Sequence, residues 1–280
     1  MPHTEGHITG ARDTAIFHQY WEPEASQRAL LLIVHGAGEH GARYADFARL
    51  CNARGYVVAA IDHVGHGRSG GIPGDLVDFD DYLQDLNQWR ELLRTRFPDL
   101  PQFLVGHSMG GLVAGRYLLG HQAEFAGAVL SASLLITNDA PGPVLRKVIN
   151  LLARIAPRLG VHKVDPAGVS RDPEVVRRYV DDPLNFHGAM GTRMLRELFD
   201  AIDVLTARVG EITLPLLVLH GAKDKLTSPE GSQLLADCAG SQDKQLTLYP
   251  ELYHEIFNEP EREAVIEDVL SWCDARLPAQ

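Results

Sequence analysis

The sequence predicts an α/β fold: a mostly parallel sheet flanked by helices, with one inserted helical segment. Three observations lead to this prediction. Short apolar runs alternate with segments of helical periodicity, which is the pattern of a parallel sheet. The hexapeptide Gly-His-Ser-Met-Gly-Gly at 106–111 lies between such a run and a helix-prone stretch. The alternation stops after residue 133 and resumes at 213, so we expect a core at 1–133 and 213–280 and a helical cap at 134–212.

The elements of the expected core follow one another in a regular order. An antiparallel hairpin of two edge strands is expected at about 7–21, around the turn at 9–13. Continuous apolar runs indicate strands buried on both faces, and apolar residues at helical spacing indicate the helices between them. The expected strands are 29–34, 56–61, 102–105, 127–131, 214–219 and 245–249, and the expected helices are 44–54, 78–97, 112–121, 230–238 and 262–276. Between 133 and 212 we expect helices and no strand.

Composition excludes several classes of protein. The formal net charge of −11 argues against a general nucleic-acid binder, because phosphate contacts require clustered basic residues. Three cysteines without CxxC spacing indicate buried thiols, not a disulfide framework or a metal site. No stretch approaches the roughly 18 to 20 apolar residues of a transmembrane helix, and residues 1–10 lack a signal-peptide apolar region. We therefore expect a cytoplasmic protein.

Ser108 is the candidate nucleophile. It follows an apolar run and precedes a helix, so it lies where a strand turns sharply into a helix. Gly106 and Gly110 carry no side chains that would obstruct this turn. The first N–H groups of the helix and its dipole favour negative charge beside the hydroxyl. His107 adjoins the serine, and we expect its side chain to point away from the Ser108 hydroxyl.

Asp224 and His254 are the candidate acid and base. A serine hydroxyl needs a base to remove its proton, and the base needs an acid to orient it. For a nucleophile on a strand–turn–helix elbow, the chain order is serine, then acid, then histidine. Asp224 and His254 each follow one of the last two expected strands, so both should reach the edge of the sheet that carries Ser108. Asp200 and Asp203 are rival acids, but both fit a helix of the cap better.

An oxyanion hole requires two backbone N–H groups. One should belong to Met109, directly after the nucleophile. The other should come from the loop His35-Gly36-Ala37-Gly38 after the first buried strand, where Ala37 is the candidate. The alternative for this loop is a tight turn without a chemical role.

With these residues placed, the chain resembles the monoacylglycerol lipases of the α/β-hydrolase superfamily over nearly its whole length. The stretches that match are HGAGEH at 35–40, DHVGHGRSGG at 62–71, GHSMGG at 106–111 and SQDKQLTLY at 241–249. The resemblance implies a triad of Ser108, Asp224 and His254, and an oxyanion hole at Ala37 and Met109. It also implies that Glu39 and Arg43 shape a polar pocket for the glycerol end of a lipid ester. The implied activity is cleavage of monoacylglycerol to fatty acid and glycerol through an acyl-enzyme, without cofactor or metal.

Two positions depart from the vertebrate members of that family. Phe257 stands where a further histidine, three residues after the catalytic one, would contribute to the glycerol pocket. Thr227 replaces a reactive cysteine after the acid loop. Head-group preference is therefore open between monoacylglycerol and the substrates of a lysophospholipase, a general carboxylesterase or a thioesterase. A non-catalytic receptor using the same pocket is a more remote alternative.

The stretch 144–155 predicts an amphipathic helix in the cap. Seven of its apolar residues fall on one side of a helix, while Arg146, Lys147, Asn150 and Arg154 fall on the other. No acidic residue occurs from 141 to 163, although the chain as a whole is acidic. Two hypotheses fit this pattern: the helix docks transiently on a lipid interface, or its apolar side packs on the core.

Overall fold

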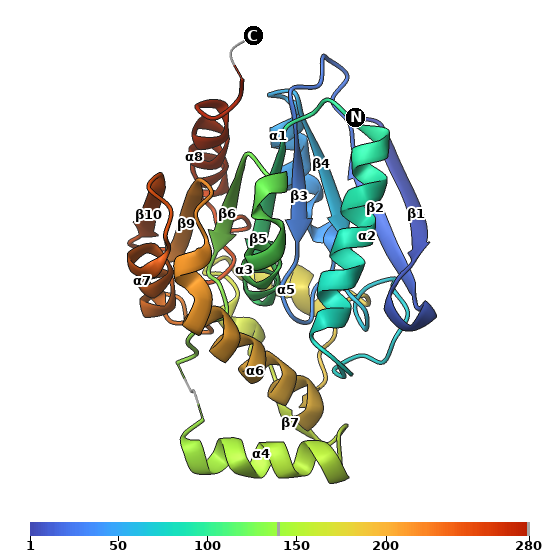
Figure 1. The fold of residues 1–280 in the computed structure, drawn as a ribbon, viewed down its shortest axis with the longest axis vertical. Helices are drawn as coiled ribbons and strands as arrows, with labels where there is room; N and C mark the ends of the chain where they lie inside the picture. Colours follow the sequence, from blue (N-terminus) through green and yellow to red (C-terminus); the bar gives the residue numbers. More distant parts are fainter. Residues whose placement is uncertain (139–140, 279–280) are drawn as a thin grey trace.

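The computed structural model describes residues 1–138 and 141–278 and contains one eight-stranded mixed sheet (Figure 1). Its strand order is β1-β2-β4-β3-β5-β6-β9-β10. The strands are β1 (His3–Thr9), β2 (Ala15–Trp21), β3 (Ala29–Val34), β4 (Tyr56–Ile61), β5 (Gln102–His107), β6 (Gly127–Ser131), β9 (Leu216–Gly221) and β10 (Lys244–Tyr249). From β4 to β10 all neighbours are parallel, whereas β1 and β2 pair antiparallel, as do β2 and β4. This confirms the predicted α/β fold with a mostly parallel sheet.

Helices cover both faces of the sheet because its central strands are apolar on both sides. In β3, Leu30 and Leu32 belong to one buried cluster and Leu31 and Ile33 to the other. One face packs against α1 and α8, and the opposite face against α2, α3 and α7. The bounds of these helices are α1 (Ala45–Asn52), α2 (Asp80–Arg96), α3 (Met109–His121), α7 (Pro229–Cys238) and α8 (Arg262–Asp274).

The inserted segment, residues 134–212, connects β6 to β9, and its described residues form three α-helices, two 3-10 turns and two short strands. The helices are α4 (Pro143–Ile155), α5 (Pro173–Asp181) and α6 (Thr192–Arg208). Figure 1 shows α6 crossing below the sheet and α4 lying farthest from it. Among the described helices, none combines the length and apolar character needed to cross a bilayer.

Three sequence-based expectations about these elements are wrong. The segment 134–212 contains a two-stranded antiparallel sheet, β7 (Gly160–His162) with β8 (Met190–Gly191), where no strand was expected. These strands are too short to produce a periodic pattern. Of the first hairpin, only β1 lies at the edge, since β2 also pairs with β4. Cys238 is exposed, whereas Cys51 and Cys273 are buried thiols as expected.

Polar contacts tie the inserted segment to the rest of the molecule. Asp75, in the loop between β4 and α2, accepts hydrogen bonds from Arg158 at 3.1 Å and from Arg193 at 2.6 Å. The backbone N–H of Phe186 donates to the carbonyl of Gly38 at 2.9 Å. The second contact matters for the site, because Gly38 belongs to the loop that follows β3.

Candidate active site

Ser108 occupies the turn between β5 and α3 in a backbone conformation that non-glycine residues rarely adopt. Its φ is 55° and its ψ is −120°. The Ser108 N–H donates to the carbonyl of Ser131 at 2.9 Å, and the Ser108 carbonyl accepts from the N–H of Leu134 at 3.0 Å. Contacts on the β6 side thus hold a strained turn, which is the conformation expected of a nucleophile elbow.

Gly106 and Gly110 allow this turn for a steric reason. A Cβ atom on Gly110 would lie 1.9 Å from the carbonyl oxygen of Val34 at the end of β3. A Cβ atom on Gly106 would lie 2.6 Å from the carbonyl oxygen of Gly110. Strand β3, the turn and helix α3 therefore approach one another more closely than a side chain at position 106 or 110 would permit.

The loop after β3 lies directly against Ser108. Val34 is in register with Gly106 of β5, so the residues following both strands emerge side by side. A Cβ atom on Gly36 would be 3.1 Å from the Cβ of Ser108. Ala37 lines the same cavity as Ser108. Met109 begins α3, and the first N–H groups of a helix have no partner within the helix.

Asp224 and His254 meet, although 30 residues separate them in the chain. The Nδ1 of His254 lies 2.7 Å from Oδ2 of Asp224. The other carboxylate oxygen, Oδ1, accepts from the backbone N–H of Leu226 at 2.7 Å and from that of Thr227 at 3.1 Å. His254 lines the cavity with Ser108, and both members of the pair are buried. The rival acids Asp200 and Asp203 are on α6; Asp203 lines the same cavity but is hydrogen-bonded to Arg146 of α4 at 2.7 Å.

The close contact between Asp224 and His254 shifts the pKa values of both groups. Burial alone would raise the pKa of Asp224, but the charge of His254 and hydrogen bonds from His220 and His254 hold it well below its usual range. Burial would lower the pKa of His254, yet the Asp224 carboxylate outweighs burial and raises it. The pair therefore favours a carboxylate beside an imidazole that gains a proton readily.

His107 lies closer to the site than the sequence suggested. Its ring centroid is 4.7 Å from that of His254, and it lines the same cavity. Burial lowers the pKa of His107 to about 3. A neutral ring packed against His254 limits the positions that the His254 ring can take.

Glu39 and Arg43 belong to a buried cluster whose third charged member, Glu255, the sequence did not reveal. Arg43 donates to Glu39 at 2.7 Å and makes two hydrogen bonds of 2.7 Å each to Glu255. The other oxygen of Glu39 accepts from the Gly36 N–H at 2.7 Å, so Glu39 also braces the loop that carries Ala37. Glu39 and Glu255 line the cavity, whereas Arg43 lies behind them and contacts the ring of Tyr179.

The two carboxyl groups of this cluster differ in acidity. Burial raises the pKa of Glu39 despite the nearby Arg43. Burial would also raise the pKa of Glu255, but the charge of the Arg43 guanidinium and its two hydrogen bonds to Glu255 lower it instead. Phe257, two residues further on, does not reach the cavity: it packs on Phe47 with ring centroids 5.1 Å apart. Glu255 therefore brings polarity to a region from which Phe257 is directed away.

The cavity itself has a volume of about 670 Å³ and two unlike ends. Near Ser108 it is polar, with Glu39, Glu255 and Tyr179 in its wall. The remaining wall is largely apolar and comes mostly from the inserted segment; it includes Leu145, Val148 and Ile149 of α4 and Leu198, Phe199 and Ile202 of α6. Within residues 1–138 and 141–278, no group of three or more His, Cys, Asp or Glu side chains is arranged to hold a metal ion.

Fold and site together define a protein of the α/β-hydrolase superfamily. Residues 25–261 match the family model described as serine aminopeptidase, S33. The chain is 38% identical to a monoacylglycerol lipase of Mycolicibacterium smegmatis over 98% of both proteins, and 33% identical to a monoglyceride lipase of Mus musculus over 98% of this chain and 91% of that one. The crystal structure of a monoacylglycerol lipase from Paleococcus ferrophilus superposes with a TM-score of 0.82 at 29% identity, covering 93% of this chain and 99% of that one. The chain belongs to the monoacylglycerol lipase family, a family of carboxylic ester hydrolases.

Proposed function

We propose that this protein cleaves monoacylglycerol to a fatty acid and glycerol through an acyl-enzyme on Ser108. The observation that carries the proposal is the cavity of about 670 Å³, which joins a largely apolar wall to a polar end at Ser108 and His254. That shape suits a single acyl chain esterified to a small polar alcohol. The names of the relatives support the same substrate class.

Ser108, His254 and Asp224 are assigned the roles of nucleophile, base and orienting acid. Because Nδ1 of His254 faces Asp224, Nε2 is the nitrogen that takes the Ser108 proton as Oγ attacks the ester carbonyl. His254 then delivers this proton to the glycerol oxygen as the carbon–oxygen bond breaks. Water, deprotonated by His254, attacks the acyl-enzyme in turn and releases the fatty acid and the Ser108 hydroxyl.

The N–H groups of Ala37 and Met109 are assigned to the oxyanion hole. They belong to the two segments that meet at Ser108, the loop after β3 and the first turn of α3. One such donor contributes about 3 kcal/mol to lowering the barrier. Glu39 supports this arrangement, since it holds the N–H of Gly36, the residue before Ala37.

The polar end of the cavity favours an uncharged head group that carries hydroxyls. A head group entering there meets the carboxyl groups of Glu39 and Glu255, while Arg43 lies behind them and is hydrogen-bonded to both. Carboxylate oxygens accept hydrogen bonds from hydroxyls and repel phosphate. This arrangement favours glycerol over the head group of an anionic lysophospholipid, and it supports the proposal that Glu39, backed by Arg43, shapes a glycerol pocket.

The inserted segment, residues 134–212, is assigned the role of a cap that receives the acyl chain and contacts lipid. Its helices α4 and α6 supply most of the apolar cavity wall. Val144 and Ile155 on α4 are 76% and 70% exposed, beside the exposed basic residues Lys147 and Arg154. An exposed apolar surface flanked by cations suits peripheral contact with an anionic lipid interface.

The test is a panel in which the acyl chain is constant and the head group varies. Monoacylglycerol, diacylglycerol, lysophosphatidylcholine, lysophosphatidylglycerol, acyl-CoA and a p-nitrophenyl ester are compared in kcat/KM. We expect monoacylglycerol to lead, and Ser108→Ala to lower its turnover by about 10⁴-fold or more. Comparable cleavage of every ester would refute the head-group assignment, and a folded wild type that cleaves none of them would favour a receptor.

A second variant tests the charge of the polar end. Glu255→Gln removes one carboxylate while keeping the size of the side chain. We expect the ratio of lysophosphatidylglycerol to monoacylglycerol turnover to rise about fivefold, as removal of one like charge about 4 Å away implies. The matched control is Glu251→Gln, which changes an exposed glutamate. An unchanged ratio in Glu255→Gln would contradict charge selection.

A further inference from the structure

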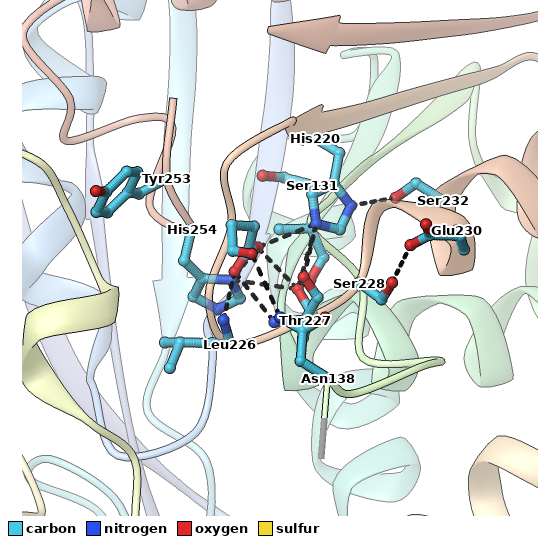
Figure 2. A network of polar contacts seen from close by, with 12 residues as sticks. Ser131, Asn138, His220, Leu226, Thr227, Ser228, Glu230, Ser232, Tyr253 and His254 are labelled. Carbon is cyan, nitrogen blue, oxygen red and sulfur yellow. Dashed lines mark hydrogen bonds and ion pairs between the residues drawn. The ribbon is translucent and has the colours of Figure 1, made fainter. Parts of the chain in front are cut away.

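His220, the buried histidine near the end of β9, is not part of the cavity wall but contacts the group behind it. Its Nε2 lies 3.0 Å from Oδ2 of Asp224, and its Nδ1 lies 2.7 Å from the hydroxyl of Ser232 in α7. Figure 2 shows the His220 ring between Ser232 on one side and Thr227 and His254 on the other. We propose that His220 is a positioning residue, which fixes the Asp224 carboxylate and sets the proton affinity of His254.

The surroundings of the His220 ring determine its tautomer. Nε2 faces the Asp224 carboxylate and, at 3.4 Å, the carbonyl oxygen of Thr227, so this nitrogen carries a proton and donates it. In the neutral ring Nδ1 is then an acceptor, and the Ser232 hydroxyl donates to it. A continuous chain of hydrogen bonds results, from Ser232 through His220 to Asp224, which His254 meets from the other side.

Among the described residues, four N–H donors surround the Asp224 carboxylate, together with the Thr227 hydroxyl, which also lies 3.1 Å from the carbonyl oxygen of Ala132. His254 Nδ1, His220 Nε2 and the Thr227 hydroxyl all reach Oδ2, the last at 2.9 Å, while two backbone N–H groups reach Oδ1. Each additional hydrogen bond to Oδ2 stabilises the negative charge of the Asp224 carboxylate. The carboxylate then stabilises the protonated form of His254 less strongly. Without these hydrogen bonds, His254 would keep its proton up to a higher pH. It would then act as a base over a narrower range of pH.

Other ionisable groups surround this chain of contacts, and the variants below leave them unchanged. Those acting on His254 are His107 from β5, Glu39 from the loop after β3, and Glu255 beside it. On the His220 side the charged neighbour is Glu230 in the first turn of α7. A shift seen on changing His220 or Ser232 alone is therefore attributable to the hydrogen-bond chain.

The experiment compares pH profiles of kcat/KM for p-nitrophenyl ester hydrolysis by His220→Leu, His220→Gln and wild type. The inference rests on the proposed triad, and this ester tests it independently of the head group. For His220→Leu we expect the acid limb to move to higher pH by about half a unit to one unit, and kcat to fall about tenfold at similar KM. His220→Gln retains an N–H donor of similar reach, so its acid limb and its kcat should both lie close to those of wild type.

Further variants and a second readout separate positioning from folding. Ser232→Ala removes only the hydrogen bond between Ser232 and His220. It should shift the acid limb of the pH profile to higher pH by a smaller amount than His220→Leu does. His121→Leu, at the surface end of α3, is the control and should not shift it. The rate at which a fluorophosphonate modifies Ser108 should show the same pH shift without any turnover. If folded His220→Leu and Ser232→Ala both keep the wild-type profile, the inference is overturned; if wild type cleaves no ester, the proposed function itself fails.

Discussion

Two glycines in α3 show how differently the same residue type can act. Gly110 lies in the first turn, where a Cβ atom would collide with the carbonyl oxygens of Val34 and His35 at 1.9 and 2.5 Å. Both oxygens belong to the backbone, which cannot rotate away as a side chain can. Gly120, near the other end of the helix, has no atom within 4 Å of an added Cβ.

We therefore expect opposite effects from one substitution at these two positions. Gly110→Ala should separate β3 from the elbow, destabilise the fold by about 1 to 3 kcal/mol or more, and lower kcat at least about 100-fold. Gly120→Ala should stabilise by about 0.5 to 1 kcal/mol, because alanine favours a helix interior. Chemical unfolding gives the stability of both variants, and ester hydrolysis gives their kcat. A Gly110→Ala variant as stable and active as wild type would contradict the prediction.

Helix α4 directs some of its apolar residues toward the protein interior and others toward solvent. A single apolar stripe that packs on the core would not do this. Ile149 and Ala153 are buried, whereas Val144, Leu151 and Ile155 are exposed. Packing on the core, the second hypothesis from the sequence, therefore accounts for only part of the stripe. Leu145 and Val148 are also exposed but line the cavity, whereas Val144, Leu151 and Ile155 do not, so these three can be changed without altering the cavity wall.

The docking of α4 is tested by Val144→Ser combined with Leu151→Ser. We expect binding to phosphatidylglycerol-containing vesicles to weaken about tenfold, because two apolar side chains no longer enter the interface. Hydrolysis of a water-soluble p-nitrophenyl ester should stay unchanged. Leu248→Ser, on exposed β10, is the control for loss of one surface leucine. Vesicle binding at the wild-type level in the folded double variant would exclude docking through this surface.

At the scale of elements, the sequence predicts most where a pattern is local and repeated. The strands 29–34, 56–61 and 127–131 were expected with the bounds that the structure has, because each is a continuous apolar run. The nucleophile elbow was predictable for the same reason, since strand, serine and helix are contiguous. β8 has only two residues, and no periodicity can be read from so short an element.

Three buried histidines lie together beneath the loops that follow β3 and β4. The ring centroids of His35 and His63 are 4.4 Å apart, and those of His35 and His66 are 5.4 Å apart. Burial lowers the pKa of His63 to about 3 and that of His66 to about 4, and it lowers the pKa of His35 well below its usual value. Folding therefore requires all three rings to be neutral.

The consequence is a loss of stability on mild acidification. The unfolded chain takes up these protons near pH 6.5. The folded chain takes up those of His63 and His66 only near pH 3 and pH 4, and that of His35 well below pH 6.5, so the free energy of unfolding should fall as pH decreases below about 6.5. The expected slope is about 1.4 kcal/mol per pH unit for each histidine, partly offset by Asp85, whose pKa burial raises to about 6. Urea unfolding at pH 7 and at pH 5 measures this change in the free energy of unfolding.

His63→Phe isolates one contribution to this slope. Neither ring nitrogen of His63 has a hydrogen-bond partner among the described residues, so phenylalanine replaces the ring without breaking a bond. We expect the variant to be at least as stable as wild type at pH 7 and to lose less stability at pH 5. His121→Gln, at the surface, should follow the wild-type curve. A His63→Phe slope equal to that of wild type would show that this ring does not contribute.

For the whole molecule, sequence reasoning indicates candidate residues of the site but not the contacts that surround them. Chain order and strand ends indicated Ser108, Asp224 and His254, and the structure brings the last two into contact. Glu255 escaped notice because its partner Arg43 is 212 residues away. His220 was unremarkable in sequence because a histidine ending a buried strand has no pattern of its own. Such support arises from long-range packing, which no local window contains.

The pairing of β6 with β9 has a consequence for how proteins of this fold diversify. These strands are hydrogen-bonded neighbours, so the chain leaves the sheet for residues 134–212 and returns to it about 5 Å away. A replacement of any length can span that gap without moving the sheet, and each doubling of its length costs only about 0.6 kcal/mol in closure entropy. The apolar cavity wall supplied by this segment can thus be exchanged through evolution while the proposed nucleophile, acid and base stay where the sheet holds them.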